Sequence, residues 1–148
     1  IKALISFGNV KKGELGGYVE KEDNLCHSGN AWVTDNAWVY GNAWVYGNAR
    51  VYGNARVTGD AKVSDYAKVT GNAWVYGNAE VTDFAWVTGN AKVTGDAWVT
   101  GNARVYGSAR VTGDARVSDD AKVSGNAKVT GDAEVNGDAE VTGGELLN

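Results

Sequence analysis

The chain has few large apolar side chains and almost none of the residues that metal sites and disulfides need. Methionine and proline are absent, and the sequence holds two phenylalanines, one cysteine and one histidine. Alanine and valine carry most of its 43% hydrophobic residues, so the core must be thin. A single cysteine excludes an internal disulfide and an all-cysteine zinc cluster, and a single histidine excludes a site with two histidine ligands. We therefore expect no metal site and no cofactor.

Charge and hydropathy narrow the classes of partner. A net charge of −4 gives no general attraction to nucleic acid or to anionic lipid. No apolar run approaches the roughly 20 residues of a membrane span, and no basic-then-apolar signal segment opens the sequence. We expect a soluble protein without a membrane partner and disfavour nucleic-acid binding. The sequence begins at Ile1 and not at a methionine, so this expectation covers the printed residues only.

A six-residue repeat dominates the sequence. Alanine occupies every sixth position from Ala31 to Ala139, and valine follows each alanine by two residues, from Val33 to Val141. The two residues before each alanine are Gly or Asp and then most often Asn or Asp, as in the stretch GNAWVYGNARVYGNARVT at 41–58. Ala-x-Val has the period of a strand with one apolar face, and Gly-Asn or Gly-Asp is typical of a tight turn. Each repeat is therefore a short strand followed by a corner.

Because every repeat must turn the same face inward, the strands cannot form a hairpin meander. They predict a triangular prism with three repeats, or 18 residues, in each turn, and parallel strands stacked about 4.8 Å apart. The repeats in 29–142 give about six turns. We expect an all-β, single-stranded parallel β-helix. Its predicted parts are an N-terminal cap with an imperfect first turn at 1–28, the repeats at 29–142 and a tail at 143–148.

The repeat phrase V-x-[GD]-[ND]-A-x over residues 29–142 resembles the hexapeptide repeat of left-handed parallel β-helix proteins. The opening residues GNVKKGELGGYVEKEDNLCHSGNAWVTDNAWVYGNA are more specifically similar to the YdcK-like family, bacterial and prophage proteins often labelled as transferases. The resemblance implies left-handed winding, which the period alone leaves open. It also favours the cytoplasm or a phage particle over secretion.

Positions 18 apart should lie on neighbouring turns, which assigns the outward side chains to three faces. The first face carries Trp32, Arg50, Lys68, Trp86, Arg104, Lys122 and Glu140; the second carries Trp38, Arg56, Trp74, Lys92, Arg110 and Lys128; the third carries Trp44, Lys62, Glu80, Trp98, Arg116 and Glu134. On the third face, Lys62–Glu80 and Arg116–Glu134 are predicted ion pairs between turns. In a corner column, Tyr66 should stack on Phe84.

Two sets of outward residues are candidate binding surfaces. All six tryptophans occupy outward positions, and three tyrosines stand beside them: Trp32, Trp38, Trp44, Trp74, Trp86, Trp98, Tyr40, Tyr46 and Tyr76. They either cover strand edges and pack on neighbouring Tyr and Arg side chains, or they form an interface. The second face also holds a basic stripe of Lys92, Arg110 and Lys128, which is either a solvated charged face or an anion-binding stripe.

The two ends of the repeat are predicted from its phase. Extended backward, the phase puts Leu25 in an alanine position and His27 in a valine position, so His27 should be buried or should cap the first turn, with Cys26 facing outward. Large apolar residues of 1–24 should plug the N-terminal end of the prism: Ile1, Leu4, Ile5, Phe7, Val10, Leu15, Tyr18 and Val19. At the other end, either Leu146 and Leu147 fold over the core, or a cap lies beyond 148, or another chain covers it.

Two functions remain open. The resemblance implies an acyltransferase that uses acyl-coenzyme A, with a catalytic histidine and an active site between the subunits of a trimer. The repeats contain no histidine and no inserted loop between 29 and 142, and we assign no catalytic residue. The preferred hypothesis is a non-catalytic scaffold that displays side chains for self-association, for a protein partner or for a glycan, in a setting that the resemblance associates with prophages.

Overall fold

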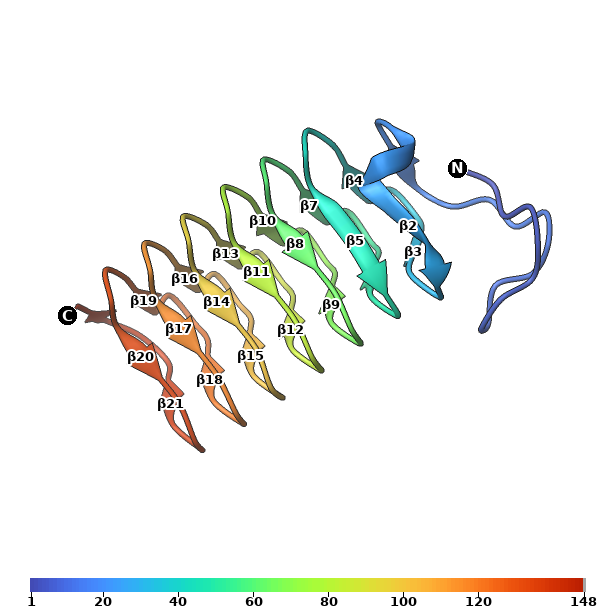
Figure 1. Ribbon diagram of the computed structural model, residues 1–148. Coiled ribbons are helices and arrows are strands. Elements are labelled where there is room, and N and C mark those ends of the chain that lie inside the picture. The colour runs from blue at the N-terminus through green and yellow to red at the C-terminus, as the bar shows by residue number, and fades with distance from the viewer. Residues whose placement is uncertain (148) are drawn as a thin grey trace.

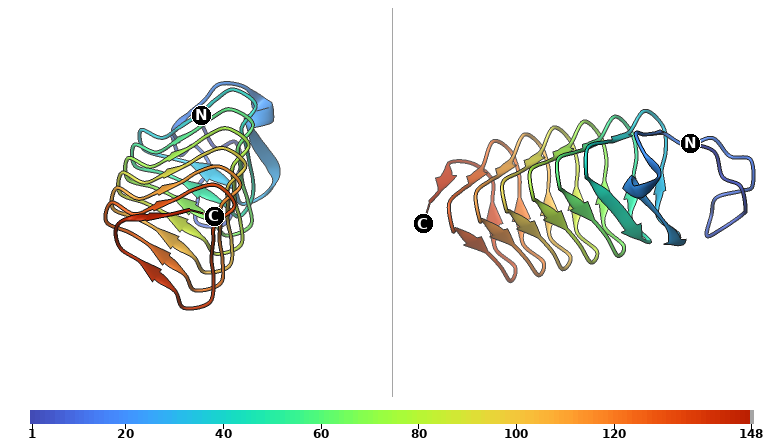
Figure 2. Two further views of the ribbon diagram at one scale, coloured as in Figure 1. Left: turned by 90° about the vertical axis from the view of Figure 1, so that its left-hand side faces the viewer. Right: turned by 45° about the horizontal axis from the view of Figure 1, so that its top comes forward.

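The chain forms an all-β parallel solenoid, in a computed structural model that describes residues 1–147 (Figure 1). Short strands wind around a triangular core with three repeats in each turn, and one such turn is called a rung below (Figure 2). The predicted fold class is confirmed. The strands are β1 (Tyr18–Val19), β2 (Leu25–Gly29), β3 (Trp32–Val33), β4 (Trp38–Val39), β5 (Trp44–Gly47), β6 (Arg50–Val51), β7 (Arg56–Val57), β8 (Lys62–Val63), β9 (Lys68–Val69), β10 (Trp74–Val75), β11 (Glu80–Val81), β12 (Trp86–Val87), β13 (Lys92–Val93), β14 (Trp98–Val99), β15 (Arg104–Val105), β16 (Arg110–Val111), β17 (Arg116–Val117), β18 (Lys122–Val123), β19 (Lys128–Val129), β20 (Glu134–Val135), β21 (Glu140–Val141) and β22 (Glu145–Leu146).

Three parallel sheets form the sides of the prism. The first face is the sheet β3-β6-β9-β12-β15-β18-β21; the second is β1-β4-β7-β10-β13-β16-β19-β22; the third is β2-β5-β8-β11-β14-β17-β20. Neighbouring strands pair in parallel, as in Trp86 opposite Arg104. The sheets contain seven or eight strands, against the six turns predicted. The first face has seven strands from the regular repeats, β2 adds a strand to the third face, and β1 and β22 extend the second face at its two ends.

The core is a stack of alanine and valine, as the repeat predicts. Every repeat alanine and valine from Ala31 to Val135 is at most 4% exposed. The outward residue between them donates its backbone N–H to the next rung, as Trp38 does to the Ala55 carbonyl at 2.9 Å. Constant side-chain volume in the two inward positions therefore lets identical rungs stack without gaps.

The corners need a left-handed backbone at one position. Gly59 has φ +71°, and a Cβ there would lie 2.9 Å from the backbone N and O of Gly77 on the next rung. Aspartate takes the same conformation at four corners, including Asp83 with φ +58°. The Asp83 carboxylate accepts the Gly101 N–H at 3.1 Å, so the side chain bonds to the rung that its Cβ approaches. Glycine and aspartate thus solve one corner geometry in two ways.

A hook formed by residues 1–16 covers only part of the N-terminal end. Antiparallel bridges join Lys2 to Leu15 and Phe7 to Val10, and Ala3 and Val10 are buried against the first face. The expectation that all the large apolar residues plug the prism is wrong for several of them. The side chains that point into solvent are Leu4 (80% exposed), Ile5 (69%), Leu15 (73%), Tyr18 (54%) and Ile1 (40%). Four of these residues lie on the solvent side of the hook, while Tyr18 is an outward residue of β1 on the second face.

The predicted positions of Leu25 and His27 are also wrong. Leu25 pairs with Val45 and Gly29 pairs with Gly47, so β2 holds two more residues than the partner segment of β5. This bulge shifts the phase, and the His27 side chain is 75% exposed, 3.2 Å from the Glu22 carboxylate. The buried polar residue is instead Asn24, which ends the 3₁₀ turn η1 (Glu22–Asn24) and donates to the carbonyls of Gly41 and Ala43.

At the C-terminal end the tail continues the solenoid instead of folding over it. Strand β22 joins the second face, with Leu146 opposite Val129. Leu146 and Leu147 are 37% and 66% exposed, while Val141 is only partly buried against the core. The first of the three alternatives for this end, a cap made by the two leucines, is therefore wrong for the residues described.

Candidate functional site

The outward column of the second face consists mainly of aromatic residues and cations that contact each other between rungs. Tyr18 stacks on Trp38 with ring centroids 5.0 Å apart, and Trp74 lies between two cations, with the Arg56 guanidinium 5.2 Å and the Lys92 ammonium 5.4 Å from its ring. A shallow hollow of about 510 Å³ opens beside Trp38 at the N-terminal end of this face. The face therefore offers cation–π pairs that are fixed by the rung spacing and open to solvent.

The predicted basic stripe exists as a continuous column. Arg110 pairs in register with Lys92 on one side and with Lys128 on the other. None of the three forms an ion pair with a carboxylate of residues 1–147. Like charges directly opposite each other are unfavourable. At the two ends of the stripe, Lys92 lies over the Trp74 ring and Lys128 pairs in register with Glu145. Whether it binds an anion stays a prediction.

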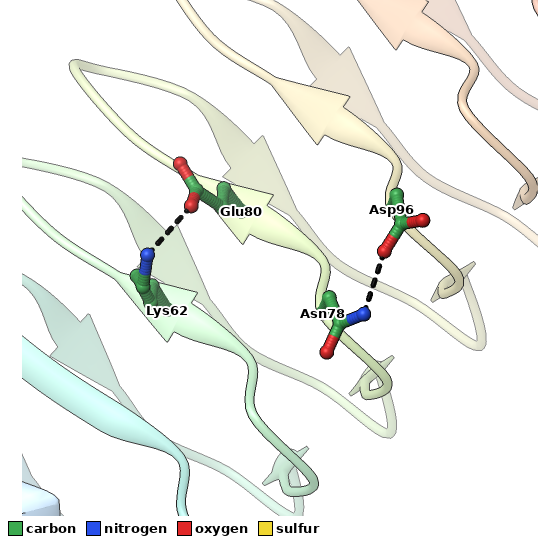
Figure 3. Close-up of polar contacts among 4 residues, drawn as sticks. All are labelled: Lys62, Asn78, Glu80 and Asp96. Atoms are coloured by element: carbon green, nitrogen blue, oxygen red, sulfur yellow. Dashed lines mark hydrogen bonds and ion pairs between the residues drawn. The ribbon is translucent and has the colours of Figure 1, made fainter.

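The third face is balanced in charge. The Lys62 ammonium lies 2.9 Å from the Glu80 carboxylate (Figure 3), and Arg116 lies 3.9 Å from Glu134, which confirms both predicted ion pairs. The hydrogen bond to Glu80 and its negative charge raise the pKa of Lys62. At the N-terminal end of this face, Trp44 stacks on Tyr46 with ring centroids 4.3 Å apart. This face consequently has less unpaired charge than the other two.

The first face carries more cations than carboxylates, as its sequence column predicts. Lys68 and Arg104 lie on the rungs on either side of Trp86, with the Lys68 ammonium 5.8 Å from the Trp86 ring, and Arg50 lies one rung beyond Lys68. Further along, Lys122 pairs with Glu140 at 2.5 Å. The two members of that ion pair stand one full turn apart in the sequence, so the spacing rule that found the third-face pairs could also have found this one.

One tryptophan is not exposed, and its assignment to the binding surface needs correction. Trp32 occupies an outward position in β3, but the N-terminal hook folds over it and leaves it 5% exposed. Phe7 contacts it edge-on, with ring centroids 5.5 Å apart, and its indole nitrogen has no hydrogen-bond partner in the described residues. Trp32 therefore anchors the hook and is not available to a partner.

The other tryptophans point into solvent, and the three tyrosines of the predicted surface are half-buried beside them. The exposed fractions are 49% for Trp38, 43% for Trp44, 38% for Trp74, 36% for Trp86 and 48% for Trp98. They lie on all three faces, so the structure does not gather them into one patch. Tyr46 packs on Trp44, Tyr76 lies edge-on to Trp74, and Tyr40 lines the hollow beside Trp38.

The corner between the third and first faces carries a column that sequence reasoning noted but did not assign to a site. Tyr66 and Phe84 stack there with ring centroids 5.1 Å apart and an angle of 7°, which confirms the predicted stack. They are 54% and 62% exposed. Amides extend the same column on other rungs, where Asn30 donates to Asn48 at 2.8 Å and Asn102 donates to Asp120 at 3.0 Å.

Residues 1–147 contain no group of three or more His, Cys, Asp and Glu side chains placed to hold a metal ion, and no helix among them is long and apolar enough to cross a bilayer. His27 has only Glu22 as a close charged neighbour and lies at the bulge of β2. What the faces do present is aromatic rings, cations and amides in fixed, repeating positions.

Comparison with known families gives one match. The model described as the YdcK beta solenoid repeat matches residues 43–57 and 49–65, which form the strands β5 to β8 and their corners. The match covers a small part of the chain and supports membership of a β-solenoid repeat family, without bearing on activity. No curated protein matches the chain.

Proposed function

We propose that this chain is a non-catalytic β-solenoid scaffold that binds a partner through the aromatic and cationic columns on its faces. The observation that carries the proposal is the exposure of five tryptophans in a protein whose core is already filled by alanine and valine. Because these tryptophan side chains are not part of the core, they can stabilise the fold only through contacts with other surface residues. Large exposed aromatic residues are typical of interfaces.

The proposal includes several finer points that come from the family resemblance. The winding is left-handed, as in hexapeptide-repeat proteins, and the setting is the bacterial cytoplasm or a prophage-encoded particle. The partner is a second copy, another protein or a glycan, since tryptophan and tyrosine rings stack on sugars as well as on protein side chains. The acyltransferase alternative has no contact in its favour among the described residues.

The test replaces exposed tryptophans while leaving the hook intact. The variant W38S/W44S/W98S removes three indoles that are each more than 40% exposed, and N126S is a control that removes an exposed corner side chain outside the aromatic and cationic columns. Both should keep the wild-type circular dichroism and thermal midpoint. The tryptophan variant should lose affinity for the partner, or dissociate if the wild type is an oligomer, as measured by size-exclusion chromatography with light scattering and by binding assays.

Two results would contradict the proposal. If the tryptophan variant matched the wild type in both molar mass and partner binding, the exposed indoles would not form the interface. If the wild type were a trimer that bound acyl-coenzyme A in calorimetry, the non-catalytic assignment would fail and the acyltransferase assignment would replace it.

A further inference from the structure

A groove runs along the first face beside the corner that joins it to the third face. Its volume is about 720 Å³, and it spans the rungs from the N-terminal hook to the corner after β17. We call it the aromatic groove and define it by Arg50, Tyr66, Lys68, Phe84, Trp86 and Arg104. Its cations and Trp86 come from β6, β9, β12 and β15, while Tyr66 and Phe84 come from corners. It lies outside the surfaces that sequence reasoning selected, apart from Trp86.

The groove has an excess of unpaired positive charge. Arg50 and Lys68 stand on adjacent rungs, about 4.8 Å apart, and Arg104 lies two rungs beyond Lys68. Within residues 1–147 none of these three cations forms an ion pair, whereas Lys122, the next cation of the column, is neutralised by Glu140. Asp120 enters the groove only at its C-terminal margin and accepts a hydrogen bond from Asn102. An anionic ligand would relieve the repulsion between the two adjacent cations.

The aromatic residues of the groove break the local pattern of the repeat. The corner position of Tyr66 and Phe84 holds asparagine or aspartate on the other described rungs of this column, where amides bond from rung to rung. At Tyr66 that ladder stops, and the Asn48 amide nitrogen donates to no atom of the described chain. The two rings replace the ladder with exposed apolar surface next to Trp86. The groove thus combines cations, a free amide donor and the exposed edges of two stacked aromatic rings beside Trp86.

We propose that the aromatic groove binds an acidic polysaccharide, a linear chain of sugars that carries uronate carboxylates. Such a chain has hydroxyl groups for the amides, apolar C–H faces for the exposed aromatic residues and carboxylates for Arg50, Lys68 and Arg104. The inference rests on the proposed scaffold role and names the ligand class for one groove of that scaffold.

Other occupants fit the groove less well. Single-stranded nucleic acid binds by stacking bases on aromatic side chains, but Tyr66 and Phe84 lie face to face at 7°, so no base can insert between them. A second copy that docked through the same face would place its own cations opposite those of this groove. A uronate chain avoids both costs, since it need not insert between the two rings and it brings carboxylates to the cations.

The test titrates the full chain with a panel of uronate oligosaccharides in a calorimeter: oligogalacturonate, alginate oligosaccharide and hyaluronan oligosaccharide. Methyl-esterified oligogalacturonate is the neutral control ligand. The variants K68Q/R104Q and F84N alter the groove, and F84N restores the asparagine of the repeat. The matched control K92Q/R110Q removes two cations from the second face. Circular dichroism and thermal midpoints establish that each variant folds.

At least one uronate should bind, and its methyl ester should not. K68Q/R104Q should weaken binding by about tenfold or more, F84N should also weaken it, and K92Q/R110Q should leave it within about twofold. A loss in K92Q/R110Q equal to that in K68Q/R104Q would overturn the location. Binding of none of the panel, tighter binding of an oligothymidylate, or a groove-dependent rise in molar mass would each overturn the ligand class. The scaffold proposal would survive these failures as long as the surface tryptophan variant still lost its partner or dissociated.

Discussion

Substitutions of the corner glycines test how closely neighbouring rungs approach each other. In Gly59→Ala the new Cβ would lie 2.9 Å from both the N and the O of Gly77, closer than real Cβ contacts come. In Gly137→Ala, at a corner with a similar positive φ, the new Cβ would meet nothing within 4 Å. Both substitutions force alanine into the left-handed region, so the difference between them isolates the approach of the next rung.

The left-handed backbone costs about 1–2 kcal/mol in both variants. Gly59→Ala must in addition push its rung away from Gly77, which weakens the 2.8 Å hydrogen bond from Asp60 N–H to the Gly77 carbonyl, worth about 1 kcal/mol, and strains the packed corner. We expect Gly59→Ala to cost about 1–3 kcal/mol more than Gly137→Ala. Gly59→Asp should fall between them, because its carboxylate can accept the Gly77 N–H as Asp83 accepts that of Gly101.

The assay is urea unfolding followed by far-ultraviolet circular dichroism, with the wild type and the three variants measured side by side. Equal slopes with shifted midpoints would mean that stability alone changed. The reasoning is refuted if Gly59→Ala is no less stable than Gly137→Ala, or if Gly59→Asp is less stable than Gly59→Ala. The first result would mean that rungs separate freely, and the second that aspartate gains nothing from the bond to the next rung.

Three further predictions concern single contacts. The Thr100 hydroxyl donates a hydrogen bond to the Asp83 carboxylate, which lowers the pKa of Asp83. Ionised Asp83 therefore stabilises the folded protein above the unfolded pKa of about 4. This contribution is lost as the pH falls through the lower pKa of the folded state. The wild type should therefore lose its advantage in thermal midpoint over Asp83→Asn only on acidification below about pH 4, and an advantage that grew there would contradict the sign. A double-mutant cycle on Lys62 and Glu80 should give a coupling below about 1 kcal/mol that shrinks with added salt, because the pair is 45% and 25% exposed; a salt-independent coupling would argue against a screened surface pair. Trp32→Ser should release the hook and speed proteolysis within residues 1–16 while the circular dichroism of the repeats is kept, and unchanged proteolysis would show that Trp32 does not anchor it.

The repeat predicted the parts of the structure that depend on the phase alone. Each inward alanine and valine, the three faces, the Lys62–Glu80 pair and the stack of Tyr66 on Phe84 all follow from a spacing of three repeats. No insertion interrupts that spacing between 31 and 141. The outward residues that lie next to each other on neighbouring rungs can therefore be predicted from their separation of 18 positions in the sequence.

The repeat could not predict two kinds of position: residues covered by a segment outside the repeat, and residues beside a bulge that changes the number of residues in a strand. Trp32 is outward by its number, but only tertiary packing by residues outside the repeat reveals that the hook covers it. His27 was misplaced because the two extra residues in β2 are invisible until its pairing with β5 is known. The aromatic groove also escaped prediction, since it is formed by an outward column of the first face together with a column of the adjoining corner.

The regular step of three repeats per rung gives the surface a reading frame. All repeats are equivalent to the core, since each supplies one alanine and one valine, but the face of an outward residue is set by the place of its repeat within the group of three. Removing one whole rung would shorten the prism and keep every column aligned. Removing a single repeat would leave the core equally well filled yet rotate everything downstream by one face, so that the cations of one sheet would continue the column of its neighbour. Insertions and deletions of whole rungs therefore preserve the outward columns. The gain or loss of one repeat, like a frameshift in a coding sequence, would move every downstream outward residue to a different face.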